Sequence, residues 1–141
     1  MSEFRKRTEI TIKKEKVLFS LPFYIPMVDY SKIIKDLEAN TNIESGFVVS
    51  RDGLLIYTDA ENIHTIPFAA MNATILSSAE FAMDEIGEGI PKRIIVEGKK
   101  KNIVIVGAGK DLLLAVIVNG NFDEIFEKIA EAAKKIAAGG K

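Results

Sequence analysis

Apolar positions along the chain change their spacing several times, and the first clear spacing is helical. Ile33, Ile34 and Leu37 recur at intervals typical of one helix face. Asp29 or Ser31 can begin this helix, because a short polar side chain at that position accepts a backbone hydrogen bond. The polar run at residues 40–42 ends it.

Two short apolar runs follow, at residues 45–49 and 54–57, and they flank the dipeptide Asp52-Gly53. Asp-Gly between two apolar runs favours a tight β-turn, since glycine adopts a positive φ at little cost. The pattern therefore predicts a β-hairpin.

A second helix is predicted from about Ile66 to Ile86, and fifteen residues between His64 and Glu80 carry no formal charge. A helix covered on one side only shows a polar face to water. One apolar stripe is expected, consisting of Phe68, Met71, Ile75, Ala79 and Ile86. Small or apolar residues cover much of the remaining surface: Ala69, Ala70, Ala73, Leu76, Ser77 and Met83. Ordinary core helices share this pattern, but a second copy of the chain is the simplest second cover for the helix.

Three further apolar runs, at residues 94–96, 103–106 and 112–118, are separated by breaks short enough for antiparallel hairpins. A last helix is expected to begin at Asn119 or Asn121. Its apolar residues at helical spacing are Phe122, Ile125, Phe126, Ile129, Ala133 and Ile136.

The order of elements is thus helix, two strands, helix, three strands, helix. The run at residues 113–118 is continuously apolar, and a strand that is apolar on both faces is covered on both faces. We expect an α/β (α+β) domain with a five-stranded antiparallel sheet and helices on each side, covering residues 29–141.

Residues 1–28 form a separate N-terminal extension in this interpretation. The first sixteen residues carry six basic and three acidic side chains. Such a run is most often a solvated arm, although it could contact an anionic membrane. Residues 8–13 alternate like an edge strand, and residues 17–28 read as an extended apolar strap because two prolines prevent a helix.

Composition excludes several kinds of chemistry. The 141 residues include no cysteine and one histidine, His64, so thiolate nucleophiles and sites built from cysteine or paired histidines are excluded. The net charge of −1 predicts no bulk attraction to nucleic acid. The chain has no run of about 18 uncharged apolar residues, so no membrane-spanning helix is predicted. A cytoplasmic protein is expected.

Candidate catalytic motifs are weak in this chain. Residues 107–110 (GAGK) lack the flanking residues of a phosphate-binding loop and are read as a tight turn. His64 is read as a surface or capping residue at a helix start. Asp52 belongs to the hairpin turn, so a catalytic pair with Asp59 is not expected. We predict no catalytic residues, no metal and no cofactor.

The segment Ile43–Ile56 (IESGFVVSRDGLLI), followed by a helix rich in small residues, three strands and a terminal helix, resembles the roadblock family of dynein light chain-like proteins. The resemblance covers about Tyr30 to Ala138. It implies a homodimer joined through the third strand, with the second helices of the two subunits packed together. The implied interface residues are Ala70, Ala73, Thr74, Ser77, Arg93, Ile94, Ile95, Val96 and Glu97.

The same resemblance implies a non-enzymatic module that binds and regulates, or scaffolds, a small Ras-like GTPase. Asn72 and Ser78 are polar positions on the second helix and are candidates for contact with that partner. The alternative is a small-molecule sensor, in which Phe68, Met71 and Phe81 would line a pocket between helix and sheet.

Overall fold

The domain is built from five strands and three helices in the computed structural model, which describes residues 28–121 and 124–139. The helices are α2 (Tyr30–Glu38), α3 (Thr65–Glu85) and α4 (Phe126–Ala137). The strands are β1 (Ile43–Ser50), β2 (Leu55–Thr58), β3 (Ile94–Glu97), β4 (Lys101–Ala108) and β5 (Leu112–Asn119). All neighbouring strands are antiparallel, and their order across the sheet is β2-β1-β5-β4-β3. The predicted order of elements and the antiparallel sheet are confirmed.

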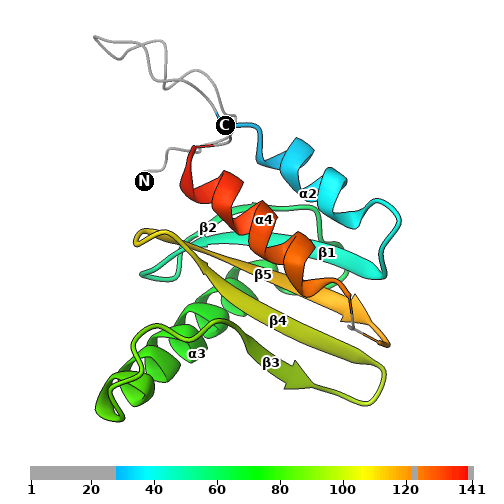
Figure 1. The fold of residues 1–141 in the computed structure, drawn as a ribbon. Helices are drawn as coiled ribbons and strands as arrows, with labels where there is room; N and C mark the ends of the chain where they lie inside the picture. The colour runs from blue at the N-terminus through cyan, green and yellow to red at the C-terminus, as the bar shows by residue number, and fades with distance from the viewer. Residues whose placement is uncertain (1–27, 122–123, 140–141) are drawn as a thin grey trace, which may run out of the picture.

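Helices cover both faces of the sheet, as predicted (Figure 1). On one face α2 and α4 pack over a core that includes Ile34, Val116 and Ile129. On the other face α3 packs over a smaller core around Phe47, Leu76 and Ile105. The continuously apolar run of β5 is explained by this arrangement, since its successive side chains enter opposite cores.

Local sequence signals account for the first helix and the hairpin. The Asp29 side chain accepts a hydrogen bond from Lys32 N–H at 3.2 Å and caps α2. In the β1–β2 turn, Gly53 adopts a φ of +97°. Gly46 lies in β1 beneath α2, and an added Cβ there would lie 2.8 Å from Ile34 Cδ1. The missing side chain thus lets α2 approach the sheet.

The start of the last helix was predicted wrongly. Asn119 is still the last residue of β5 and pairs with Lys101, so it cannot begin a helix. Positive φ values at Gly120 and Glu124 turn the backbone before α4 begins at Phe126. The chain therefore needs a longer connection than the apolar periodicity suggested.

The expected stripe on α3 also requires correction. The buried residues of this helix are Ala69, Asn72, Ala73 and Leu76, a face made mostly of small side chains. Met71 and Ile86, which were placed in the stripe, are exposed. The basic arm, the alternating residues 8–13 and most of the strap at residues 17–28 lie outside the described residues.

Candidate functional site

The outer edge of β3 is one candidate interaction surface. Among the described residues β3 pairs with β4 alone, so its other edge has no strand beside it. Ile95 and Val96 remain 38% and 40% exposed on this strand. An unpaired strand with exposed apolar side chains is a template for pairing with another chain.

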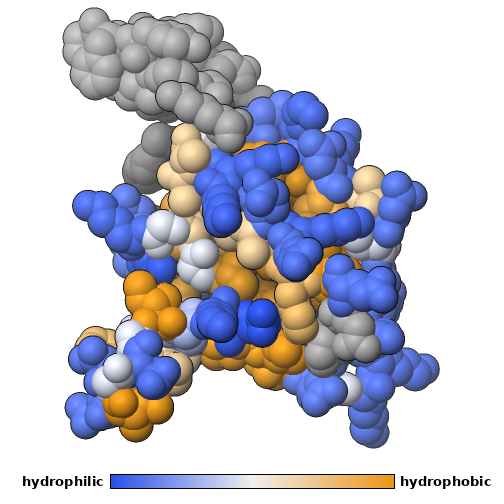
Figure 2. Space-filling view, viewed as in Figure 1, coloured by the Kyte–Doolittle hydropathy of each residue, from blue (hydrophilic) through white to orange (hydrophobic). Residues whose placement is uncertain are grey.

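The outer face of α3 is a second candidate surface. Large apolar side chains project into solvent along it and just beyond its end, and Phe81 is 74% exposed. The others are Ile66, Met71, Ile86 and Ile90. Figure 2 shows apolar surface below the sheet between α3 and β3 and small apolar patches among hydrophilic side chains at the end of α3, whereas hydrophilic side chains dominate over α2 and α4. Several large exposed apolar side chains along one element are typical of a protein–protein contact.

One flank of α3 lies against a turn of the sheet. The β1–β2 turn contacts Ala70 and Ala73, since an added Cβ on Gly53 would come within 4 Å of both residues. At 100° per residue, Ala79 and Ala82 lie roughly opposite Ala70 on the helix, so their flank points away from the β1–β2 turn.

The predicted interface residues fall into three groups in the structure. Arg93 to Glu97 are all at the free edge of the sheet. Ala70, Thr74 and Ser77 are exposed on α3, and Thr74 Oγ1 donates to Ala70 O at 3.1 Å. Ala73 is only 6% exposed, because it packs against its own β1–β2 turn and sheet. Its place in a seam between two helices was therefore predicted wrongly.

The two residues predicted to contact a partner protein, Asn72 and Ser78, lie in different environments. Ser78 is exposed on the outer face of α3. Asn72 is 1% exposed and faces the sheet, where its Nδ2 donates to Phe68 O at 2.8 Å and its Oδ1 has no hydrogen-bond partner. The prediction that Asn72 offers a surface contact was wrong, because a polar residue type does not tell which helix face it occupies.

Arg51 connects α3 to two turns of the sheet. Its Nη1 donates to both carboxylate oxygens of Glu80 on α3, at 2.7 and 2.9 Å. Its Nε and Nη2 donate to the carbonyl oxygens of Leu112 and Gly109, each at 2.8 Å. Gly107 leaves the space for this arrangement, because an added Cβ there would lie 2.7 Å from the Arg51 Nη2 atom. A bidentate pair with two further hydrogen bonds holds α3 in a defined position on the sheet.

A pair of carboxyl groups joins the end of α2 to the end of β2. Burial, and then the neighbouring Asp59 carboxylate, raise the pKa of Glu38 to about 8. Asp59 Oδ1 also accepts a hydrogen bond from Gly46 N–H at 3.0 Å. Burial and the nearby charges of Asp59, Glu38 and Asp29 raise the pKa of Tyr57. At neutral pH the Glu38 carboxyl therefore keeps its proton.

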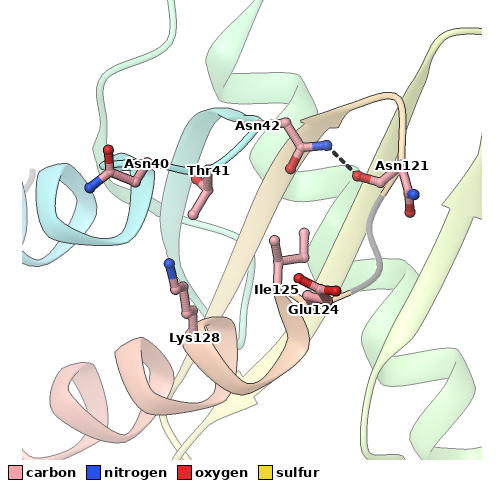
Figure 3. Close-up of a pocket in the computed structure, with 7 residues that line it drawn as sticks. All are labelled: Asn40, Thr41, Asn42, Asn121, Glu124, Ile125 and Lys128. Carbon is pink, nitrogen blue, oxygen red and sulfur yellow. Dashed lines mark hydrogen bonds between the residues drawn. The ribbon is translucent and has the colours of Figure 1, made fainter.

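The hollows in the described surface are open and shallow. One of about 500 Å³ lies between the α2–β1 connection and the start of α4 (Figure 3). Figure 3 shows its polar lining, with Asn42 Nδ2 donating to the carbonyl oxygen of Asn121. Another, of about 530 Å³, lies beside Arg51 and is bordered by Phe81 and Ile90.

The residues proposed for a small-molecule pocket do not line a common cavity. Phe68 packs against Phe47 with a ring-centroid distance of 4.7 Å, so it belongs to the core. Met71 and Phe81 project into solvent instead. Over the part of the chain that the structure describes, no group of three or more His, Cys, Asp or Glu could hold a metal ion. None of the helices in that part is long and apolar enough to span a membrane.

Comparison of the sequence with protein families identifies a match. The family model for the Roadblock/LC7 domain matches residues 30–118, which is more than half of the chain. The chain belongs to the Roadblock/LC7 domain family. The predicted resemblance is thereby confirmed, and the matched region includes α2, α3, four strands and all but the last residue of β5.

Similar proteins agree with this Roadblock/LC7 fold. An uncharacterized protein of Methanocaldococcus jannaschii, MJ1340, is 29% identical over 119 residues, covering 79% of this chain and 98% of the relative. Among solved structures, MglB of Myxococcus xanthus superimposes with a TM-score of 0.71 at 21% identity, covering 77% of this chain and 92% of that one. A structure of MglB with a tetrameric arrangement gives a TM-score of 0.72 at 13% identity, covering 84% and 97%.

Sequence reasoning missed the Arg51–Glu80 contact of this Roadblock/LC7 domain. Gly107 was read as part of a tight turn, which is an incomplete description, and Arg51 was not singled out. Arg51 and Glu80 are 29 positions apart, so no local spacing would pair them. The available signal was the isolated acidic residue on an otherwise uncharged stretch of helix.

Proposed function

We propose that this Roadblock/LC7 domain is a non-enzymatic module that forms a homodimer and binds and regulates, or scaffolds, a small Ras-like GTPase. The observation that carries the proposal is that the β3 edge and the outer face of α3 are both exposed and apolar. Membership of the Roadblock/LC7 family supports it. A cytoplasmic location is part of the proposal.

In the proposed dimer the two β3 edges meet and the sheets join into one of ten strands. A two-fold axis at this edge makes the interface self-complementary, as in most homodimers. The flank of α3 that points away from the β1–β2 turn would then approach the same flank of the partner helix. It carries Ala79 and Ala82, whose small side chains allow close packing.

The paired α3 helices would present an outward surface to the GTPase, and Ser78 lies on it. Neither Lys nor Arg occurs between Thr65 and Glu85, so the helix has no cation to place at a transferring phosphate. Arg51 is already held by Glu80 and by two carbonyl oxygens. Regulation by preferential binding to one nucleotide state of the partner is therefore favoured over a direct catalytic contribution.

A pull-down from native lysate tests the proposal. The full-length chain is immobilised and exposed to lysate with a non-hydrolysable GTP analogue or with GDP. We expect a Ras-like GTPase to be enriched in one nucleotide condition, as identified by mass spectrometry. Ser78→Lys, on α3, should lose this enrichment, while Glu131→Lys, exposed on α4 across the sheet, should keep it. Equal capture with both nucleotides overturns regulation by nucleotide state and leaves only scaffolding. No captured GTPase in either condition, or equal capture by both variants, contradicts the proposal.

A further inference from the structure

The free edge of β3 carries information about how a second copy would pair with it. We propose that two copies pair with Ile95 opposite the partner's Ile95, so that Arg93 of each subunit faces the partner's Glu97. This inference rests on the proposed homodimer and adds its register and the residues that select a second copy as the partner. It follows from backbone direction, side-chain face and charge.

Backbone direction limits which residues can meet. Gly98 N–H donates to Lys101 O at 3.0 Å where β3 turns into β4. In an antiparallel ladder, alternate residues bond to the same neighbour. Counting back from Gly98, the N–H and C=O groups of Ile95 and Glu97 point away from β4, toward the free edge. A new strand must therefore place its own outward-pointing residues opposite these two.

Side-chain direction gives the same restriction independently. Ile95 lies opposite Val104, which belongs to the core beneath α2 and α4. Arg93 shares this face, since its guanidinium carbon lies 4.2 Å from the centroid of the Phe126 ring at the start of α4. Opposite residues in an antiparallel pair share a face. Odd-numbered residues of β3 and its flanks must therefore meet odd-numbered residues of the partner.

The charges on the edge then show which of the remaining registers is favoured. With Ile95 at the two-fold axis, both copies of Arg93 face the partner's Glu97, and cross-strand pairs of opposite charge stabilise a sheet. Ile94 faces the partner's Val96 in the same register, which adds an apolar pair on the α3 side of the sheet. The edge is thus complementary to itself in both charge and hydropathy.

The two neighbouring registers each carry a specific cost. A register centred on Val96 places Arg93 opposite the partner's Lys99, and like charges directly opposite each other are destabilising. A register centred on Ile94 places Glu97 opposite the partner's Pro91, which has no N–H to donate to the ladder. The pairing centred on Ile95 avoids both costs within β3, since Pro91 then lies opposite the partner's Lys99, beyond the ends of the strand.

Charge exchange tests the register. Arg93→Glu replaces two attractive pairs with two repulsive ones, and Glu97→Arg does the same with opposite sign. Each variant alone should dimerise about 30-fold more weakly than the natural chain in sedimentation equilibrium. In an equal mixture, both charge pairs are restored across a heterodimer. Native mass spectrometry should then find the heterodimer almost exclusively, with an affinity close to that of the natural chain.

Single cysteines provide a second measurement, because the natural chain has none. A cysteine at the two-fold axis lies opposite itself, within the Cα separation that a disulfide spans. Under mild oxidation Ile95→Cys should give a covalent dimer. Val96→Cys and Ile94→Cys should remain largely uncrosslinked, since each faces a different residue of the partner.

The outcomes separate this register from the proposed dimer itself. A natural chain that dimerises while the charge variants keep full affinity, or while Val96→Cys crosslinks in preference to Ile95→Cys, overturns the register and leaves the dimer standing. A natural chain that sediments as a monomer at all concentrations overturns both.

Discussion

Glu38 and Asp59 make the stability of the domain depend on pH. The pKa of Glu38 is about 8 in the folded chain and 4.5 in its ordinary state, so the folded protein holds a proton that the unfolded chain releases between these values. The contribution of this group is fully present below pH 4.5 and is lost as pH rises toward 8. We expect Glu38→Gln to remove this component, because an amide donates to the Asp59 carboxylate at every pH.

Urea unfolding at pH 5, 6.5 and 8 measures the effect. The free energy of unfolding of the natural chain should fall more steeply with pH than that of Glu38→Gln. Tyr57 on β2 and Asp29 at the start of α2 remain in both proteins, and the raised pKa of Tyr57 keeps its hydroxyl protonated through pH 8. Glu131→Gln, on the exposed surface of α4, should keep the natural slope. Parallel slopes for the natural chain and Glu38→Gln would contradict a raised pKa of Glu38.

At this scale the sequence predicts residues whose role is local. Asp29 and Gly53 act through their own backbone neighbourhood, so a helix cap and a turn glycine could be recognised from position alone. Glu38 meets Asp59 across 21 residues, and Arg51 meets Glu80 across 29. Contacts of this kind depend on how whole helices and strands pack, and the spacing of residues along the sequence does not predict that packing.

At the scale of elements, α3 shows where a pattern predicts a helix without predicting its faces. The expected range, Ile66 to Ile86, lies within one residue of the observed bounds. Apolar residues occur almost all around the helix, however, so their positions could not say which side meets the sheet. Packing selected the smallest side chains, with Ala69 and Ala73 against the sheet and its turn, while Met71 and Phe81 remained outside.

Two lysine substitutions on α3 distinguish the possible seams between subunits. The proposed seam at Ala79 and Ala82 predicts that Ala82→Lys weakens dimerisation by at least about 100-fold, because it places an unpaired charge between two helices. Ser77, which the family resemblance placed in the interface, lies on the Ala70 side of the helix instead. Ser77→Lys should therefore leave the affinity nearly unchanged. Both sites are exposed in the single subunit, so both variants should fold.

Sedimentation equilibrium, with circular dichroism to confirm helix content, makes this comparison. A loss of affinity in Ser77→Lys with none in Ala82→Lys would move the seam to the opposite flank. Ala73→Glu is unsuitable for this purpose. Its side chain is buried within one subunit, so the variant would unfold the domain rather than report on the dimer.

The architecture of the whole molecule was predictable because its strands are unambiguous. Short connections between β3, β4 and β5 force antiparallel neighbours, and apolar residues on both faces require two layers of helix. The assembly follows less directly, because one chain's sequence does not show which exposed apolar surface is covered. Only the sheet order shows that β3 lies at an edge, so only the structure identifies this edge and the exposed face of α3 as the two candidate contact surfaces.

Thermal unfolding tests the assembly as a whole. If folding and dimerisation are coupled, raising the chain concentration tenfold raises the melting temperature by roughly 2–4 °C for a domain of this size. Ile95→Lys should abolish this dependence, since a lysine on the β3 edge opposes strand pairing without entering the core. Ile63→Lys makes the same change at an exposed apolar position outside the proposed interface and should retain the dependence. A melting temperature of the natural chain that does not change with concentration would mean that the subunit is stable without the partner copy.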